Sequence, residues 1–520
     1  MHRRRGLNSA PKLNVEPVSR TYDAHLPHPP LSWPCFAVLV RLAAPLDPRS
    51  LFVARASLAI VIAWDAVNKM TLAAAFYENQ RSSYPLFALE EDVGWFCAHL
   101  NPFGWFEECA CWPTILFAVT GALAMGLPWS RACSVACWLL FSAATLRNVE
   151  VSYIFDRYVH FMLIFSSSLP YAGDDPAGRL TAIGRGLSVL FFRLQLAWIY
   201  ADAGYGKVTH PNGDWTLRAR VPALAVYLMG ATPVSPFLAL DRHLLGGWIV
   251  RMLTPAAAWA ELLVGPAMMA AAAFAQPGHL IAHLAPIGGV WLLHVGIALG
   301  MENGPAIGAA ACASWLALLP AAFWKKINCE RASAAEGTTS FAEALGRGRA
   351  WPWFAPSFLL ACAAFELSGL PVRPGPLPTV LLRNRWRVFA GAEDAVIWEV
   401  APARLADGSV IDLWSWNNVS FQKPLRYGRQ GRWMSFPFGK LGSPRALGAR
   451  FGYLCREWNA AHAVQVERYQ LFELVAAIVG DPGDAVGLQL AAPSKRLLRV
   501  QGCQSSAGAE TPGSEQETNK

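Results

Sequence analysis

Apolar runs recur through the first 370 residues of the chain, and this repetition constrains the fold more than any other feature. Most runs are about 17–22 residues long, which is enough for a helix to cross roughly 30 Å of hydrocarbon. The 520 residues are 54% hydrophobic and only 15% charged, whereas about a quarter of the residues in a soluble chain are charged. We therefore expect a multi-pass α-helical membrane protein.

About nine transmembrane helices fit these runs. The expected spans are residues 50–70, 112–129, 131–145, 158–171, 186–207, 251–275, 284–300, 306–324 and 353–370. Prolines and glycines break the segment 208–250, which favours a re-entrant or interfacial helix there. Gly204 and Gly206 are expected to end the fifth helix and to leave Lys207 near a membrane surface.

Clusters of basic residues orient the spans, because cytosolic loops are enriched in Lys and Arg. Arg3-Arg4-Arg5 and the loop 325–350 should both be cytosolic, and nine spans place them on one side. The acidic loop 71–111, Lys207 and everything after residue 370 then lie on the luminal or extracellular side. Counts of eight or ten spans remain alternatives.

Four regions follow from this topology. Residues 1–48 form a flexible cytosolic tail, residues 49–370 a transmembrane bundle, residues 371–485 a small non-cytosolic α+β domain, and residues 486–520 a disordered tail.

The α+β assignment rests on a change of pattern after residue 370. Apolar and polar residues alternate in 385–400 and 403–414, which predicts strands, and Asp407-Gly408 between strand-like runs predicts a hairpin. Residues 443–475 are expected to be helical. Asn418-Val-Ser420 is a glycosylation sequon on the side where glycosylation takes place.

Polar residues inside spans are costly and commonly mark functional paths. In the fifth span Arg193, Tyr200 and Lys207 are spaced by seven and share one helix stripe, and Gln195 and Asp202 share another. Lys207 either carries chemistry or extends to the lipid headgroups, as lysines at helix ends do.

Five more polar residues lie in or beside spans. Arg55 and Asp65 in the first span are expected to hold the bundle, by pairing with each other or with other spans. Glu261 is expected to be neutral, paired with an arginine, or part of a proton path. Asp156 and His160 are one helical turn apart, so a hydrogen bond between them would orient His160 as an acid–base group or simply satisfy a buried ring.

The cysteines suggest one bridge and no metal site. Cys97, Cys109, Cys111 and Cys455 fall on the non-cytosolic side, where a bond from Cys97 or Cys109 to Cys455 would tie the α+β domain to the bundle. The alternative is a set of free or locally paired thiols. Cys109-Ala-Cys111 lacks a second ligand pair, so no metal is expected. The basic residues show no aromatic interleaving, so nucleic acid is not an expected partner.

The order and spacing of these residues resemble the HTTM family, whose domain is shared with the vitamin K-dependent gamma-carboxylases. The resemblance covers about residues 48–475. The residues that carry it are Arg55 and Asp65; Arg147-Asn148, Asp156-Arg157 and Leu169-Pro170; Gln195, Tyr200, Lys207 and Trp215; Thr254 and Glu261; His294; and, in the C-terminal part, Arg385–Phe389, Asp407-Gly408, Asp412–Trp414 and Leu454–Asn459.

In those carboxylases a lysine at the position of Lys207 is thought to deprotonate vitamin K hydroquinone. The resemblance thus implies a hydroquinone cofactor, a protein or peptide glutamate substrate, and carboxylase-like (lyase) or quinone-linked oxidoreductase activity. Its catalytic candidates are Lys207, His160 and Glu261. Its pocket candidates are Gln195, Tyr200, Asp202, Trp215, Asn148, Asp156 and Arg157.

The chemistry suits the position of Lys207, since a lysine must lose its proton to act as a base and burial disfavours its charged form. The chain departs from the carboxylases in three respects: Gly206 stands where they have a second lysine, Val149 follows Asn148 where they have histidine, and the soluble domain is small. A membrane scaffold or transport protein that keeps the bundle without the chemistry is therefore the alternative.

Overall fold

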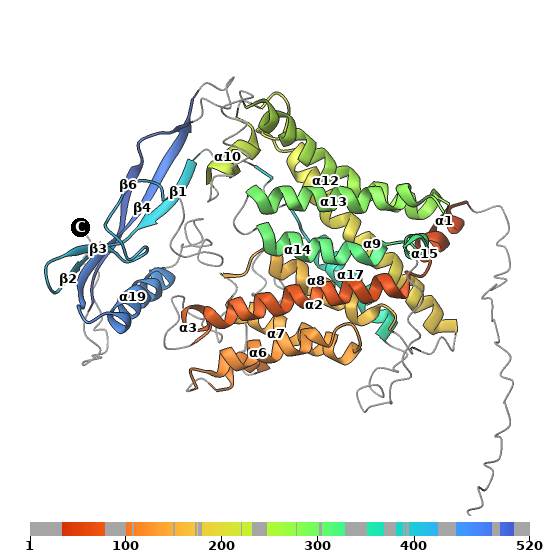
Figure 1. The fold of residues 1–520 in the computed structure, drawn as a ribbon, viewed down its shortest axis with the longest axis horizontal. Helices are drawn as coiled ribbons and strands as arrows, with labels where there is room; N and C mark the ends of the chain where they lie inside the picture. The colour runs from red at the N-terminus through yellow and green to blue at the C-terminus, as the bar shows by residue number, and fades with distance from the viewer. Residues whose placement is uncertain are drawn as a thin grey trace, which may run out of the picture.

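A computed structural model describes residues 34–78, 100–106, 109–148, 151–171, 174, 179–219, 221–230, 247–276, 278–300, 304–327, 351–368, 381–387, 390–391, 395–424, 444–480 and 489–503. This part of the chain is mostly helical, with a small sheet formed by its C-terminal portion. Figure 1 shows the long helices gathered in one bundle and the sheet standing at one end of it.

The bundle and its surroundings contain helices of very different length. They are α1 (Pro34–Leu42), α2 (Pro48–Thr71), α3 (Ala73–Phe76), η1 (Pro102–Gly104), α6 (Trp112–Met125), α7 (Arg131–Arg147), α8 (Ile154–Ser168), α9 (Arg179–Val208), α10 (Ala223–Gly230), α12 (Trp248–Phe274), α13 (Leu280–Gly300), α14 (Gly304–Trp315), η3 (Leu316–Leu318), α15 (Ala321–Lys326) and α17 (Trp351–Leu367).

A helix overlaps each expected span. Within the described part of the chain, four helices are long and apolar enough to cross a membrane: Pro48–Thr71, Leu180–Val208, Trp248–Phe274 and Leu280–Gly300. Trp112–Met125 and Gly304–Leu318 are apolar but shorter. The outward side chains of α13 include Ile281 and Leu292, which are 84% and 77% exposed, as expected of a surface that contacts lipid. These features support a membrane protein, while the count of nine spans stays a prediction.

Two local expectations about the bundle are wrong. Helix α9 continues through Gly204 and Gly206 to Val208; Gly204 faces the backbone of α12 and Gly206 faces the side chain of Arg387, so both glycines serve close packing rather than a break. The region expected to be a flexible tail contains α1, which packs against α9 and α12. Arg193 donates a hydrogen bond to the carbonyl oxygen of Leu42, and Arg41 donates one to Ala273 at 3.0 Å.

The sheet is antiparallel and is built around one long strand. Its strands are β1 (Ala395–Val400), β2 (Pro402–Leu405), β3 (Val410–Asp412), β4 (Val466–Val479), β5 (Gln489–Leu490) and β6 (Ser494–Gly502). On one edge β4 pairs with β1 and β2, and on the other it pairs with β5 and β6. The expected hairpin is present between β2 and β3, where Gly408 has a φ of 84°.

The C-terminal part differs from expectation in two places. The helix expected over 443–475 is α19 (Pro444–Ala461) followed by β4, because residues 466–479 are rich in β-branched and aromatic side chains. The disordered tail expected from residue 486 contains β5 and β6, so the sheet extends past the predicted boundary at residue 485. Residues 504–520 lie outside the described part of the chain.

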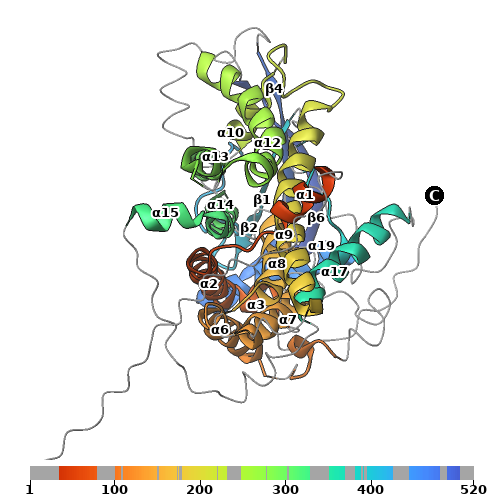
Figure 2. The same cartoon turned by 90° about the vertical axis from the view of Figure 1, so that its right-hand side faces the viewer.

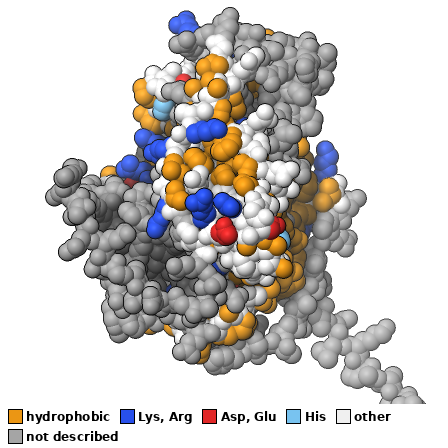
Figure 3. Space-filling view, turned by 90° about the vertical axis from the view of Figure 1, so that its left-hand side faces the viewer, with side chains coloured by type: hydrophobic (Ala, Val, Ile, Leu, Met, Phe, Trp, Pro, Cys, Tyr) orange, Lys and Arg blue, Asp and Glu red, His pale blue; other side chains and the backbone are white. Residues whose placement is uncertain are grey.

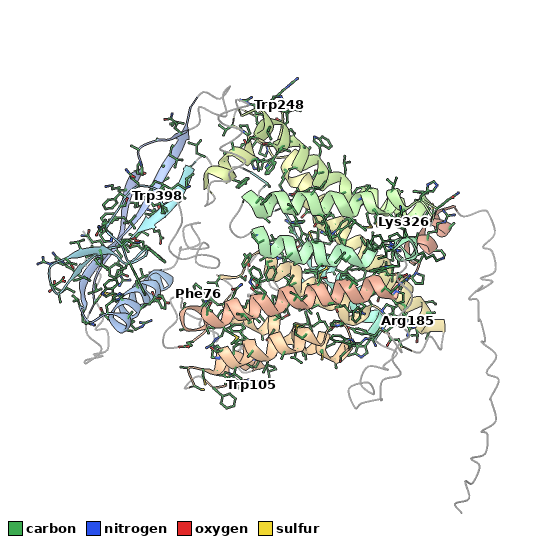
Figure 4. All side chains as sticks on the ribbon, in the orientation of Figure 1. Phe76, Trp105, Arg185, Trp248, Lys326 and Trp398 are labelled. Carbon is green, nitrogen blue, oxygen red and sulfur yellow. A yellow bond between two sulfur atoms is a disulfide. The ribbon has the colours of Figure 1, made fainter. Side chains whose placement is uncertain are left out.

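One hydrophobic cluster joins the sheet domain to the bundle. Phe76 and Phe117 from the bundle share it with Leu413, Tyr453 and Leu471 from the C-terminal domain. Figure 4 places Phe76 at the end of the bundle next to the sheet, and Arg185 and Lys326 at the opposite end. The sheet-facing end therefore has a continuous packed core, and this end carries the polar sites described below.

Candidate functional site

Two glycines allow α9 and α12 to approach closely. A Cβ atom on Gly204 of α9 would lie 2.6 Å from the Cα of Leu262, and one on Gly265 of α12 would lie 2.6 Å from the carbonyl oxygen of Ala197. Both obstacles are backbone atoms, which cannot turn aside. Small residues permit such backbone contact between membrane helices, and here it sets the polar side chains of α9 directly opposite those of α12.

The contact between α9 and α12 brings Lys207 and Glu261 together. Lys207 Nζ lies 2.5 Å from Glu261 Oε2, and the two residues are only 3% and 8% exposed. The indole of Trp215 covers the lysine, with its ring centroid 5.3 Å from Nζ, so the ammonium gains a cation–π contact. Lys207, Glu261 and Trp215, which the sequence analysis named separately, thus form one buried cluster. The partner of Glu261 is Lys207 and not an arginine.

Tyr200 lies two helical turns before Lys207 on the same stripe. Its hydroxyl oxygen is 2.7 Å from Nε2 of His294 on α13, and its ring packs edge-on against Trp315 at 5.5 Å. His294 Nδ1 is buried and has no hydrogen-bond partner within the described part of the chain. The Tyr200–His294 pair therefore continues the polar interior beyond Lys207.

Gln195 and Asp202 on the second stripe bind a segment that follows α17. We name residues 383–387 the strap; its five residues have no regular secondary structure and bind along α9. The side-chain amides of Gln195 and Asn384 exchange two hydrogen bonds at 2.9 and 3.0 Å. Asp202 accepts hydrogen bonds from the backbone N–H of Trp386 at 2.6 Å and from Arg387 Nε at 3.2 Å.

The strap inserts Trp386 into the bundle. This side chain is 2% exposed and packs against Tyr158 and Phe161 of α8. Arg157, at the start of α8, donates a hydrogen bond to the carbonyl oxygen of Arg385 at 2.9 Å. The alternation from residue 385 onward was expected to form a sheet strand, but the first part of that run pairs with helices, and β1 begins at Ala395.

Lys69, Asp65 and Asp156 form a second buried polar cluster, of which the sequence analysis named only the two aspartates. Lys69 Nζ lies 2.7 Å from Asp65 and 3.1 Å from Asp156, and all three residues are at most 4% exposed. The expected hydrogen bond between Asp156 and His160 is therefore replaced by a salt bridge from α2 to α8. Lys69 was missed, although its spacing of four residues from Asp65 is a signal for such a pair.

His160 faces α7 rather than Lys207. Its Nδ1 atom lies 2.9 Å from Ser142 Oγ and 3.1 Å from Trp138 Nε1. Phe161 and Phe358 pack around its ring, and its Nε2 atom is buried without a hydrogen-bond partner among the described residues. His160 is thus a core histidine with one bonded ring nitrogen, and it is not placed beside Lys207.

Arg55 and Asn148, two other predicted polar residues, bind backbone carbonyl oxygens near the ends of helices. Arg55 donates hydrogen bonds at 2.9 Å to the carbonyl oxygens of Ser166, Leu169 and Pro170, so it caps the C-terminus of α8 and does not pair with Asp65. Asn148 ends α7 and donates a hydrogen bond to Phe76 at 3.0 Å. Both residues therefore hold the bundle together, and Asn148 is not part of the Lys207 cluster.

The predicted bridge from the first loop to Cys455 is wrong, because Cys455 is bonded to Cys503. This bond ties α19 to the end of β6 within the C-terminal domain. Cys109 is a free, exposed thiol beside Cys111, and the hydrogen bond between the two raises the pKa of Cys111. Cys97 lies outside the described residues.

The remaining predictions concern the surface and metals. Asn418 is exposed, as a glycosylation site requires. Among the described residues no group of three or more His, Cys, Asp or Glu side chains is arranged to hold a metal ion.

No protein family, curated protein or solved structure was found to match the chain. A function for this protein is therefore inferred from the geometry of its buried polar residues.

Proposed function

We propose that the chain is a multi-pass membrane enzyme of the HTTM type in which Lys207 acts as a base. The observation that carries the proposal is the buried contact between Lys207 and Glu261. The bundle would cross the membrane nine times, with the N-terminus in the cytosol and the sheet domain on the luminal or extracellular side. The positions of Arg185 and Lys326, at the end away from the sheet, agree with this orientation.

The Lys207–Glu261 pair can store and release a proton. Burying two opposite charges removes most of their hydration, and their mutual attraction only about offsets that loss. Burial penalises charged forms, and it therefore lowers the cost of moving a proton within the pair, to amine and carboxylic acid, below the cost in water. A proton that moves along the 2.5 Å contact to Glu261 leaves the Lys207 amine free to accept a proton from a substrate O–H or C–H group.

A quinone head group fits one feature of the interior. Its oxygens need hydrogen-bond partners in a buried, aromatic site, and His294 Nδ1 is a buried atom without one among the described residues. Tyr200 and Trp315 supply aromatic surfaces beside it. We propose His294 and Tyr200 as the residues that would hold a vitamin K-type hydroquinone, which would supply the redox chemistry of a carboxylase-like or oxidoreductase reaction. The second substrate would be a protein or peptide glutamate side chain.

The test combines cofactor analysis with turnover. The purified protein should retain a bound quinone, and it should consume oxygen or carbon dioxide when a glutamate-containing peptide is added. Lys207→Ala should abolish this consumption, and because it leaves Glu261 unmatched it should also lower stability. Lys207→Met/Glu261→Leu, which removes both charges, should abolish consumption while the protein stays as stable as the wild type. Lys326→Ala, which removes an exposed lysine at the far end of the bundle, is the matched control and should leave turnover unchanged. A wild-type protein with neither bound quinone nor consumption would refute the proposal.

A non-catalytic scaffold or transport protein is the second candidate. The Lys207–Glu261 pair supports it because a matched ion pair can serve as a structural contact alone. A lysine whose charge is already matched by Glu261 and covered by Trp215 can serve to fasten α9 to α12 and nothing more. In that case Lys207→Ala lowers stability, and no substrate-linked reaction is lost because none exists.

A further inference from the structure

The strap carries an unusual concentration of arginines on its outer side. Arg383, Arg385 and Arg387 are exposed, whereas Asn384 and Trp386 between them face the bundle. Exposed and inward-facing side chains therefore alternate along the strap. The inward residues fasten the strap to α9 and α8, so the outward arginines are presented on a fixed backbone.

A fourth arginine joins this surface from α8. Arg157 donates a hydrogen bond to the carbonyl oxygen of Arg385 and lies within electrostatic range of Arg383. Like charges held close together repel one another, so such a cluster is costly unless an anion neutralises it. We call Arg157, Arg383, Arg385 and Arg387 the arginine cluster.

Among the described residues two carboxylates face the cluster, and these balance only half of its charge. Glu366, in the last turn of α17, pairs with Arg385 at 2.6 Å, and Asp202 of α9 pairs with Arg387 at 3.2 Å. Asp202 is 5% exposed and also accepts from the backbone of Trp386, so it serves the inner side of the strap. Four guanidinium groups and two carboxylates leave an excess of two positive charges.

The cluster lies where lipid headgroups would be. It joins the first turn of α8, the last turn of α17 and the final third of α9, and these three helices are neighbours in the bundle (Figure 2). Beside it on α9, Trp198 and Tyr205 are 47% and 51% exposed. Exposed Trp and Tyr at helix ends are typical of the membrane–water interface. Trp198 also donates a hydrogen bond to the strap carbonyl of Asn384 at 2.8 Å, and Arg387 lies over the ring of Tyr205.

We propose that the arginine cluster binds the phosphate of an anionic phospholipid in the leaflet at the sheet-facing end. Guanidinium groups match phosphate oxygens in geometry as well as charge. The lipid chains would lie along the apolar outer faces of α9 and α17, where Leu194 and Leu360 are 41% and 61% exposed. A lipid, rather than a soluble anion, is favoured because charge and exposed apolar surface adjoin one another.

The test is lipid binding to the full-length protein in detergent, followed by native mass spectrometry. Phosphatidylglycerol should bind to the wild type in preference to phosphatidylcholine. The double substitution Arg383→Gln/Arg385→Gln should weaken phosphatidylglycerol binding about thirtyfold, because each basic residue near an anionic surface contributes about 1 kcal/mol. Both side chains are exposed, so the fold should persist.

The matched control is Arg496→Gln/Arg499→Gln on β6. Arg496 resembles Arg385, since it is 68% exposed and pairs with Glu473 at 2.8 Å, but it lies on the sheet. This control should bind phosphatidylglycerol as the wild type does. Three results would overturn the proposal: no headgroup preference in the wild type, an equal loss in the control, or complete displacement of the lipid by inorganic phosphate, which would identify a free-anion site.

Discussion

Removing one partner of the Lys207–Glu261 pair should destabilise the protein far more than removing both. At a separation of 2.5 Å and an effective dielectric constant of 20, the attraction between two unit charges is about 7 kcal/mol. The loss of hydration for two ions is several kcal/mol each. The pair as a whole therefore contributes little net stability, while a single remaining charge keeps its own hydration loss without compensation.

These magnitudes predict a specific order among three variants. Glu261→Gln should lower the free energy of unfolding by about 3–5 kcal/mol, because it leaves the Lys207 ammonium buried and unmatched. The double substitution Lys207→Met/Glu261→Leu should cost nothing or even stabilise. Glu366→Gln, which breaks the half-exposed pair with Arg385, should cost less than about 1 kcal/mol.

Unfolding in mixed micelles with increasing dodecyl sulfate, followed by circular dichroism, measures all three variants on one scale. The Cys455–Cys503 bond must be intact in each sample, so that only the helix contact differs. If Glu261→Gln costs no more than Glu366→Gln, the pair carries no buried charge, and the argument for its proton chemistry fails with it.

Three further predictions address the packing and the other bonds. Gly204→Ala should push α9 away from α12 and lower both the thermal midpoint and any substrate-linked turnover; unchanged values would contradict the observed backbone contact. Lys69→Met should leave two buried carboxylates facing each other and cost about 3–5 kcal/mol of unfolding free energy in the same micelle assay, with Lys325→Met, an exposed lysine, as the control that should cost almost nothing. Cys503→Ser should cost about 4 kcal/mol, the chain-entropy value for a loop closed across 48 residues, and non-reducing peptide mapping of the wild type should recover Cys455 linked to Cys503; a link to the first loop would refute the assignment.

The bundle could be predicted because its signals are local. A run of apolar residues that is long enough for a membrane needs no partner to be recognised, and the bounds expected for the first and sixth spans lie within three residues of α2 and α12. The hairpin at Asp407-Gly408 is likewise encoded in its own turn residues. Such features depend on length, periodicity and backbone freedom, which the sequence displays directly.

Features that depend on distant segments were predicted less well. Gly204 was interpreted as a helix breaker, whereas its function is set by Leu262 on another helix. The bond from Cys455 to Cys503 depends on the pairing of β6 with β4, and the sequence pattern gave no sign of β6. Basic and hydrophobic side chains lie interspersed on the outer surface at the sheet end (Figure 3). Such a mixed surface is harder to recognise in a sequence than the apolar run of a membrane helix.

The stripe on α9 shows how far sequence reasoning reaches into the site. Spacing by seven placed Arg193, Tyr200 and Lys207 on one face, and the structure gives each a separate partner along that face. Periodicity can identify which side chains point inward, but the partners lie on α1, α13 and α12, at sequence distances that no local pattern encodes. The same residue types would serve a scaffold if each were matched by a fixed partner. Lys207 is the member of the stripe that pairs with a carboxylate, whereas Arg193 donates to backbone carbonyl oxygens and Tyr200 pairs with a histidine, so Lys207 is the position where the two proposed functions predict different outcomes of substitution.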